Sequence, residues 1–232
     1  MTKLYRSCFG ILLTAQLFFG CTDTTETTNT LKTGKWRGEL HPQGQNLPFE
    51  FEIEKQHDRY IVYIINVEER LKLDSITVSG DSVKMSLHIF DADLVARIYP
   101  DSMAGYWSKN FADDYKIPFT ATFGDAPRFK ANSEQQPQNF SGKYAATFVH
   151  NQTDTVKAIG IFEQQGAEVT GTFLTPTGDY RYLKGVADGN QLKLSTFDGE
   201  HAFLFVATMK ADSTLTGEFW SGKTWHEPWT AY

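Results

Sequence analysis

The stretch "PFEFEIE", residues Pro48–Glu54, decides the fold class. Phe49, Phe51 and Ile53 alternate with three glutamates. Successive side chains of a β-strand point to opposite faces of the sheet, so this alternation predicts a strand with one buried face and one solvated face.

The same signal recurs along the chain. "VKMSL" (83–87) and "QLKLS" (191–195) alternate in the same way, and "HAFLFVATM" (201–209) is more densely apolar, which predicts a strand buried on both faces. Turn residues such as "SGD" (79–81) and "DGN" (188–190) separate these stretches. From Gly34 onward no stretch has a helical period with caps, so the sequence predicts an all-β protein.

The chain repeats itself at an interval of about 110 residues. The matched blocks share a turn, an alternating strand and a second strand, and they occur in the same order in both halves. Four blocks in order favour an internal duplication. They pair residues 33–36 with 141–144, 78–98 with 186–209, the Phe-Asp steps at 90–91 and 197–198, and 105–108 with 218–221.

The repeat sets the expected organisation. We expect two tandem antiparallel units, barrel- or sandwich-like, of about eight strands each. The first unit covers 33–123, a linker rich in Pro, Gln and Asn covers 124–139, and the second unit covers 140–232.

The start of the chain is typical of a bacterial lipoprotein. Residues 1–20 have basic Lys3 and Arg6, an apolar stretch too short to span a membrane, and Gly20 before Cys21. Phe18–Cys21 resembles a lipobox, although Phe19 is larger than the residue usual there. The alternative is a plain secretory signal with an accidental cysteine. The lipobox interpretation predicts lipid on Cys21, an anchor in a membrane, and a location in a Gram-negative cell envelope, facing the periplasm or the surface.

Residues 21–32 are rich in threonine and read as a tether. Asp23-Thr24-Thr25 also resembles the short O-glycosylation acceptor of some Gram-negative envelopes, so Thr24 is a candidate site. Similar Asp-Ser and Asp-Thr steps elsewhere are explained by turns that lead into strands.

Cysteine use and charge exclude several classes of function. Cys8 lies in the leader, so cleavage before Cys21 leaves no free thiol for catalysis, redox exchange or metal binding. Loss of Lys3 and Arg6 leaves 20 Lys and Arg against 28 Asp and Glu, a net charge of −8. Without a basic cluster, nucleic acid is not an expected partner.

No motif identifies a catalytic residue, a metal site or a cofactor. The six histidines lack the spacing of metal ligands. Asp198, Glu200 and His201 are the nearest cluster, and a tight turn explains them better than a metal.

Two groups of residues remain as candidate binding or docking positions. Tyr180 and Arg181 read either as a clamp at a barrel rim or as a turn whose arginine pairs with an acid. Trp220, Trp225 and Trp229 lie within ten residues. They form either a core corner or a face that docks a ligand or a following domain.

Several blocks resemble the N-terminal region of TlpA-like thioredoxin-family envelope lipoproteins. They are "LPFEFEIE", "GDSVKMSLHIFDADL" and "YKIPFTATFGDAPRF" in the first unit, and "GTFLTPTGDYRYLKG", "LKLSTFDGEHAFLFVA" and "GEFWSGKTWHEPWTA" in the second. In that family a thioredoxin domain with a Cys-x-x-Cys motif follows this region. This sequence has no such motif, so the resemblance transfers no catalytic residue.

Three functions follow as hypotheses. The resemblance implies a non-catalytic accessory domain that spaces, docks or presents substrate to a thioredoxin-fold partner. The alternative is an autonomous lipocalin-like protein that binds a small ligand in one barrel. A structural or adhesive surface lipoprotein is the third, and the sequence does not separate it from the first.

Overall fold

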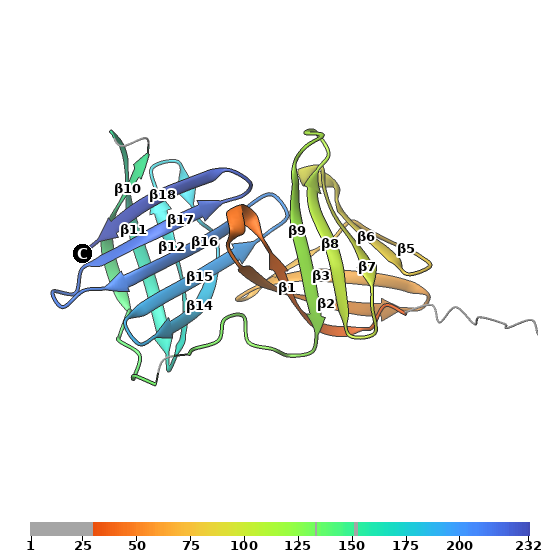
Figure 1. The fold of residues 1–232 in the computed structure, drawn as a ribbon, viewed down its shortest axis with the longest axis horizontal. Coiled ribbons are helices and arrows are strands. Elements are labelled where there is room, and N and C mark those ends of the chain that lie inside the picture. The colour runs from red at the N-terminus through yellow and green to blue at the C-terminus, as the bar shows by residue number, and fades with distance from the viewer. Residues whose placement is uncertain (1–29, 133, 151–152) are drawn as a thin grey trace, which may run out of the picture.

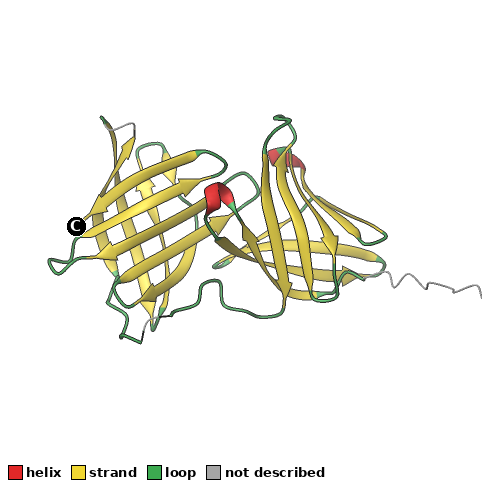
Figure 2. Cartoon of the chain, in the orientation of Figure 1, coloured by secondary structure: helices red, strands yellow, loops and turns green. Residues whose placement is uncertain are grey.

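The computed structural model describes residues 30–132, 134–150 and 153–232, and it is built almost entirely of β-strands (Figure 1; Figure 2). The predicted all-β fold with two similar tandem units is confirmed: one unit is a closed eight-stranded barrel and the other a curled nine-stranded half-barrel. Cys21, Thr24 and the leader lie outside the described residues. No described helix has the length and apolar character that a membrane crossing requires.

The first unit consists of nine antiparallel strands and two short 3₁₀ turns, η1 (Pro42–Gly44) and η2 (His88–Phe90). Its sheet runs β4-β3-β2-β1-β9-β8-β7-β6-β5 and stays open between β4 and β5. The strands are β1 (Gly34–Leu40), β2 (Leu47–Gln56), β3 (Arg59–Asn66), β4 (Glu69–Lys72), β5 (Ser75–Ser79), β6 (Ser82–Leu87), β7 (Ala92–Ile98), β8 (Ser102–Lys109) and β9 (Lys116–Phe123).

The second unit also has nine strands, and eight of them form a closed barrel. Its order is β11-β10-β18-β17-β16-β15-β14-β12, closed by pairing of β11 with β12, with β13 added beside β12. The strands are β10 (Gly142–His150), β11 (Asp154–Gln165), β12 (Glu168–Thr175), β13 (Gly178–Asp179), β14 (Leu183–Asp188), β15 (Gln191–Phe197), β16 (Ala202–Met209), β17 (Leu215–Ser221) and β18 (Trp225–Ala231).

Strand β2 has the two faces that its sequence predicts. Phe49, Phe51 and Ile53 are at most 2% exposed, and the glutamates between them face outward. β1 pairs along all seven of its residues with β2, which places Trp36 opposite Phe51 with the two rings stacked. This register puts the large apolar side chains of both strands on the concave side of the sheet.

The nine strands of the two units correspond one to one in chain order, and the units differ at one ladder. In the second unit β12 pairs with β14, from Glu168–Val186 to Gly171–Leu183. The equivalent strands β3 and β5 do not pair in the first unit, whose sheet therefore ends at β4 on one side and at β5 on the other.

Two glycines lie on the strands of the closing ladder. A Cβ on Gly185 would lie 1.7 Å from the Lys193 carbonyl oxygen of β15, and one on Gly171 would lie 2.1 Å from the Ile161 carbonyl oxygen of β11. Each glycine therefore allows its strand to approach its hairpin partner closely. From the hairpin registers, Val62 and Ile76 occupy the equivalent positions of the first unit. The two units therefore differ in residue type at both of these positions, and they differ in closure.

The barrel of the second unit is filled by its own side chains. Most of the rings inside it are less than 3% exposed and lie in edge-to-face or stacked contact. These rings fill the interior of the barrel and make it a packed core. The rings are Phe148, Phe162, Phe173, Phe205, Phe219 and Trp229.

The turn between β15 and β16 packs into the first unit. Phe197 is fully buried there, with ring centroids 4.6 Å from Phe49 and 5.2 Å from Trp107. Leu204 points out of its own barrel and belongs to the same buried cluster. The apolar stretch 201–209 is therefore buried on both faces where it enters β16, because its outer face meets the other unit.

The segment between the units carries a buried arginine. Arg128 is 3% exposed, and it donates hydrogen bonds to the carbonyl oxygens of Ile65 in the first unit (2.7 Å) and Ser195 in the second (3.0 Å). Glu50 accepts a longer one at 3.4 Å. The expected linker therefore bonds to both units through Arg128.

Candidate ligand-binding groove

The missing ladder leaves a groove in the first unit. We call the gap between Arg59–Val62 of β3 and Ser75–Ser79 of β5 the open seam. At one end the Leu73 N–H donates a 2.9 Å hydrogen bond to the Val62 carbonyl oxygen, which holds the two sides together. Away from that end the sides part around a groove of about 780 Å³. This volume is in the range of small-ligand sites.

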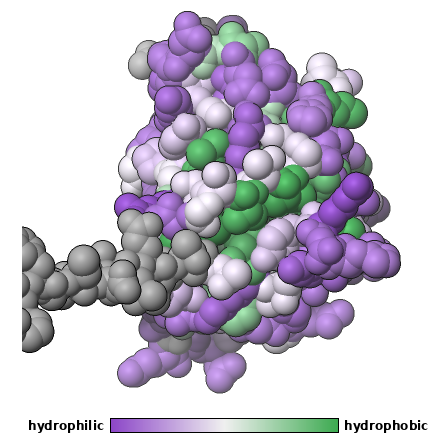
Figure 3. Space-filling view, turned by 90° about the vertical axis from the view of Figure 1, so that its right-hand side faces the viewer, coloured by the Kyte–Doolittle hydropathy of each residue, from purple (hydrophilic) through white to green (hydrophobic). Residues whose placement is uncertain are grey.

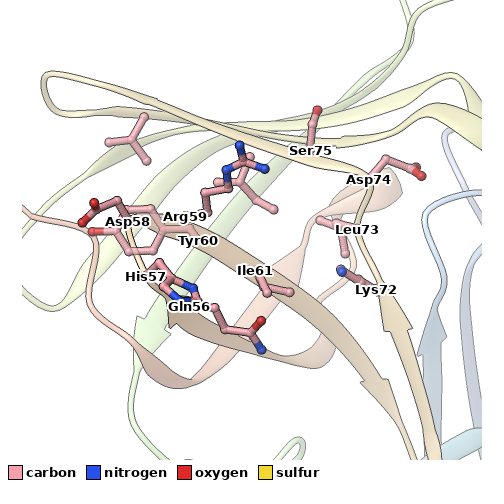
Figure 4. Close-up of a pocket in the computed structure, with 12 residues that line it drawn as sticks. Gln56, His57, Asp58, Arg59, Tyr60, Ile61, Lys72, Leu73, Asp74 and Ser75 are labelled. Atoms are coloured by element: carbon pink, nitrogen blue, oxygen red, sulfur yellow. The ribbon is translucent and has the colours of Figure 1, made fainter.

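Apolar side chains and cations line this groove (Figure 4). Tyr60, Ile61 and Leu73 come from the β3 side, and Ile76 and Val78 from β5. Val78 is 37% exposed although it is a large apolar residue. The end of the molecule that carries the first unit shows a band of apolar surface (Figure 3). This surface is what a ligand with an apolar part would cover.

Arg59 and Lys72 are the cations that line the groove, and Asp58 and Asp74 are its carboxylates. Both cations are exposed, and neither forms an ion pair with any residue that the structure describes. Figure 4 shows Arg59 between the side that carries His57 and Tyr60 and the side that carries Ser75. Asp74 accepts a 2.7 Å hydrogen bond from the His88 backbone N–H.

A second groove, also of about 780 Å³, runs along the segment between the units. Its charged groups are already paired: Lys184 lies 3.4 Å from both Glu50 and Glu168, and Arg128 bonds to both units. A ligand there would have to break these bonds. The groove at the open seam is therefore the better candidate.

Tyr180 and Arg181, adjacent in sequence, point to different places. Tyr180 packs among the rings of the second barrel, and burial raises its pKa to about 12, with a smaller contribution from the charge of Glu227. Arg181 has a left-handed backbone (φ 58°) and points outward, where it pairs with Glu69 of the first unit and with Asp198. The structure thus places Arg181 in an ion cluster between the units.

Asp198 is the buried centre of that cluster. It is 1% exposed, and burial alone would raise its pKa. Hydrogen bonds from the His201 side chain and backbone, with the charges of His201 and Arg181, outweigh burial and lower the pKa below its usual value. No group of three or more His, Cys, Asp or Glu side chains suited to a metal occurs in the part of the chain that the structure describes.

The three tryptophans of the candidate docking group lie in three environments. Trp229 is 1% exposed inside the barrel. Trp220 packs against the core of the first unit, with its ring stacked on His226. Trp225 is 45% exposed and stacks on His150 at 4.2 Å, and His150 bonds to the buried Glu227. They do not form one surface.

Sequence reasoning did not find the open seam. Arg59, Tyr60 and Lys72 belong to no motif, and the strand residues around them have ordinary alternation. The one available signal was the difference between the repeats, in which Gly171 and Gly185 have Val62 and Ile76 as counterparts.

Comparison with known proteins gives no family. No family model matches the chain, and no curated protein matches it. One matching solved structure is a protein of unknown function from the DUF3598 family of Nostoc punctiforme, with TM-score 0.27, 9% identity, and coverage of 86% of this chain and 94% of that one. Another, from Bacteroides fragilis, is described as a "putative outer membrane protein", with TM-score 0.29, 12% identity, and coverage of 86% and 95%.

The resemblance to TlpA-like lipoproteins of the thioredoxin family is therefore wrong. No thioredoxin-family model matches, and neither structure named above is described as related to thioredoxin. The blocks that suggested the family are alternating β-strands separated by Asp-Gly and Gly-Asp turns. Such blocks occur in many antiparallel proteins, because alternation and turn chemistry are set by sheet geometry.

Proposed function

We propose that the protein is a lipid-anchored binding protein of the bacterial cell envelope that holds a small amphipathic ligand in the groove at the open seam. The observation that carries this proposal is the difference between the units. The closed barrel is filled by aromatic rings, whereas its duplicate is open along one ladder and has a groove there. The proposed ligand therefore binds in the open unit.

The groove supports a ligand with an apolar body and an anionic group. Tyr60, Ile76 and Val78 offer apolar contact, and Arg59 and Lys72 offer charge that the described residues leave unpaired. Burial of apolar surface would supply most of the affinity, and a charged hydrogen bond would orient the ligand.

The envelope location rests on the leader and on Cys21 as an acylated first residue. The described chain begins beside the groove: Leu31 is 3% exposed in the core of the first unit, and its carbonyl oxygen accepts a 3.3 Å hydrogen bond from the Tyr60 hydroxyl. Leu31 is ten residues from Cys21, so the tether would reach at most about 35 Å. The anchor would thus keep the groove close to the membrane surface.

The test uses the fluorescent probe 1-anilinonaphthalene-8-sulfonate, which combines an apolar ring system with one anion. We expect saturable binding to the purified protein at one site, with displacement by laurate. The double variant Arg59→Ala/Lys72→Ala should bind the probe roughly tenfold more weakly, because a charged hydrogen bond contributes about 1.5 kcal/mol.

Lys143→Ala provides the matched control, since Lys143 is an exposed cation on the other unit. It should bind the probe like the parent. Absence of saturable binding, or equal weakening by the control, would overturn the proposed function. Electrospray mass spectrometry of the native protein, purified from envelopes, adds a direct search for a ligand that the double variant lacks.

A further inference from the structure

Among the residues that the structure describes, the two sides of the open seam are strand edges without a ladder partner. In the first unit β4 pairs with Tyr63–Asn66 of β3, the Val62 carbonyl oxygen bonds to the Leu73 N–H, and Arg59–Ile61 stay uncovered on that side. β5 pairs with β6 on its other side only. An uncovered edge presents unpaired N–H and C=O groups, which a further strand can bind.

The second unit shows what covers this edge in a complete barrel. There β14, the counterpart of β5, is covered by β12 through four residue pairs. In the first unit β3 does not take that place, and Val62 and Ile76 stand at the positions of Gly171 and Gly185. The edge of β5 is therefore left without a covering strand among the residues that the structure describes.

Edge strand β5 lacks the devices that prevent pairing with other chains. Its sequence, Ser75–Ser79, reads "SITVS": it is rich in β-branched residues and contains no charge and no proline. Protected edges carry lysine, proline or a bulge. The cations Arg59 and Lys72 line the groove beside β5.

We propose that the ligand of the open seam is an extended peptide segment with a free carboxylate, which adds as a strand to the exposed edge of β5. The peptide backbone bonds to Ser75–Ser79, alternate side chains contact Tyr60 and Val78, and the carboxylate pairs with Arg59 or Lys72. This inference rests on the groove of the proposed function and names the class of ligand that fills it.

The probe is a fluorescein-labelled hexapeptide of alternating valine and threonine with a free C-terminal carboxylate. Fluorescence polarisation should show saturable binding, weakened at least threefold when the carboxylate is amidated. Two isomers are N-methylated along opposite edges of the strand. The isomer methylated on the edge that faces β5 should lose binding, and the other should keep it, because only one edge of the added strand bonds to β5.

Variant Val78→Lys places a lysine on the β5 edge and should weaken binding of the peptide at least tenfold. Val156→Lys is the matched control, since Val156 is 39% exposed on the second unit and Val78 is 37% exposed on the first. The two variants should melt alike. Hydrogen exchange at 75–79 should slow when the peptide is bound.

The outcomes separate this inference from the proposed function. Saturable binding of the anilinonaphthalene probe, without binding of any of the peptides, overturns the peptide inference and leaves the small-ligand function standing. The peptide inference is also overturned if both N-methylated isomers lose binding equally, or if Val156→Lys weakens peptide binding as much as Val78→Lys does. Failure of both the probe and the peptides overturns both proposals.

Discussion

Substitution of Arg128 tests quantitatively how strongly the two units are held together. The Arg128→Leu variant removes a buried guanidinium that donates to the carbonyl oxygens of Ile65 and Ser195 at 2.7 and 3.0 Å. Hydrogen bonds from a charged group contribute about 1.5–3 kcal/mol each, so the two short ones contribute roughly 3–6 kcal/mol. Leucine also leaves both carbonyl oxygens without this partner.

The desolvation of the buried charge opposes this contribution and lowers the expected loss of stability. Burial disfavours the charged guanidinium and lowers the pKa of Arg128, and its Nε has no hydrogen-bond partner in the structure. Replacing a buried charge by an apolar side chain recovers part of this desolvation cost. We therefore expect a net loss of about 2–4 kcal/mol in the free energy of unfolding, a large part of the stability of an ordinary domain.

Urea unfolding, followed by circular dichroism and tryptophan fluorescence, measures this loss. Arg128 bonds to both units, so the variant should also separate the transitions of the two units along the urea axis. Arg97→Leu is the control, because Arg97 forms an exposed ion pair with Asp81 and exposed pairs contribute at most about 1 kcal/mol. A loss in Arg128→Leu no larger than in the control would refute the assignment of Arg128 as the link between the units.

Two further predictions concern the barrel and the ion cluster. Gly185→Ala should destabilise the protein by about 1–3 kcal/mol in the same urea assay, because the new Cβ would lie 1.7 Å from the Lys193 carbonyl oxygen and backbone must move; a loss below about 1 kcal/mol would contradict the close-approach explanation. The folded-state pKa of Asp198 lies below the usual value for an aspartate, so its stabilising contribution is present above about pH 4 and is lost as pH falls through the folded pKa. Asp198→Asn should therefore flatten the decline of stability between pH 5 and 2 (about the range in which a carboxylate titrates), and an unchanged slope would contradict this role.

The fold class could be predicted because it depends on local chemistry. Phe49, Phe51 and Ile53 alternate with glutamates whichever strand lies beside them, and they are buried as predicted. The duplication was also visible, and the structure confirms two similar units. Each unit has nine strands where about eight were expected, because the short β4 and β13 add one to each.

The pairing of strand edges could not be predicted from the alternation of apolar and polar residues. Alternation states which face of a strand is buried, but it does not state its neighbours. The two repeats differ at Gly171 and Gly185, whose equivalents are Val62 and Ile76, and they also differ in whether the sheet closes. These differences become meaningful only when the registers are known.

The candidate residues show the same limit. The three candidate tryptophans are close in sequence, but strand alternation and the turn at Gly222 separate them in space. Trp220 lies at the interface between the units, Trp225 at the surface and Trp229 in the core. Arg128 lies in a segment that reads as a linker, and nothing local marks it as buried. Its partners Ile65 and Ser195 are 63 and 67 residues away.

The order of strands along the chain has a consequence for synthesis. In each unit the first strand pairs with the last, β1 with β9 and β10 with β18. Neither sheet can be completed until its ninth strand has emerged from the ribosome. The core of the first unit would stay incomplete still longer, until Phe197 and Leu204 of the second unit have been synthesised. During that interval a nascent chain exposes both an unfinished core and the edge of β5, so slow translation is when this protein would most need a chaperone.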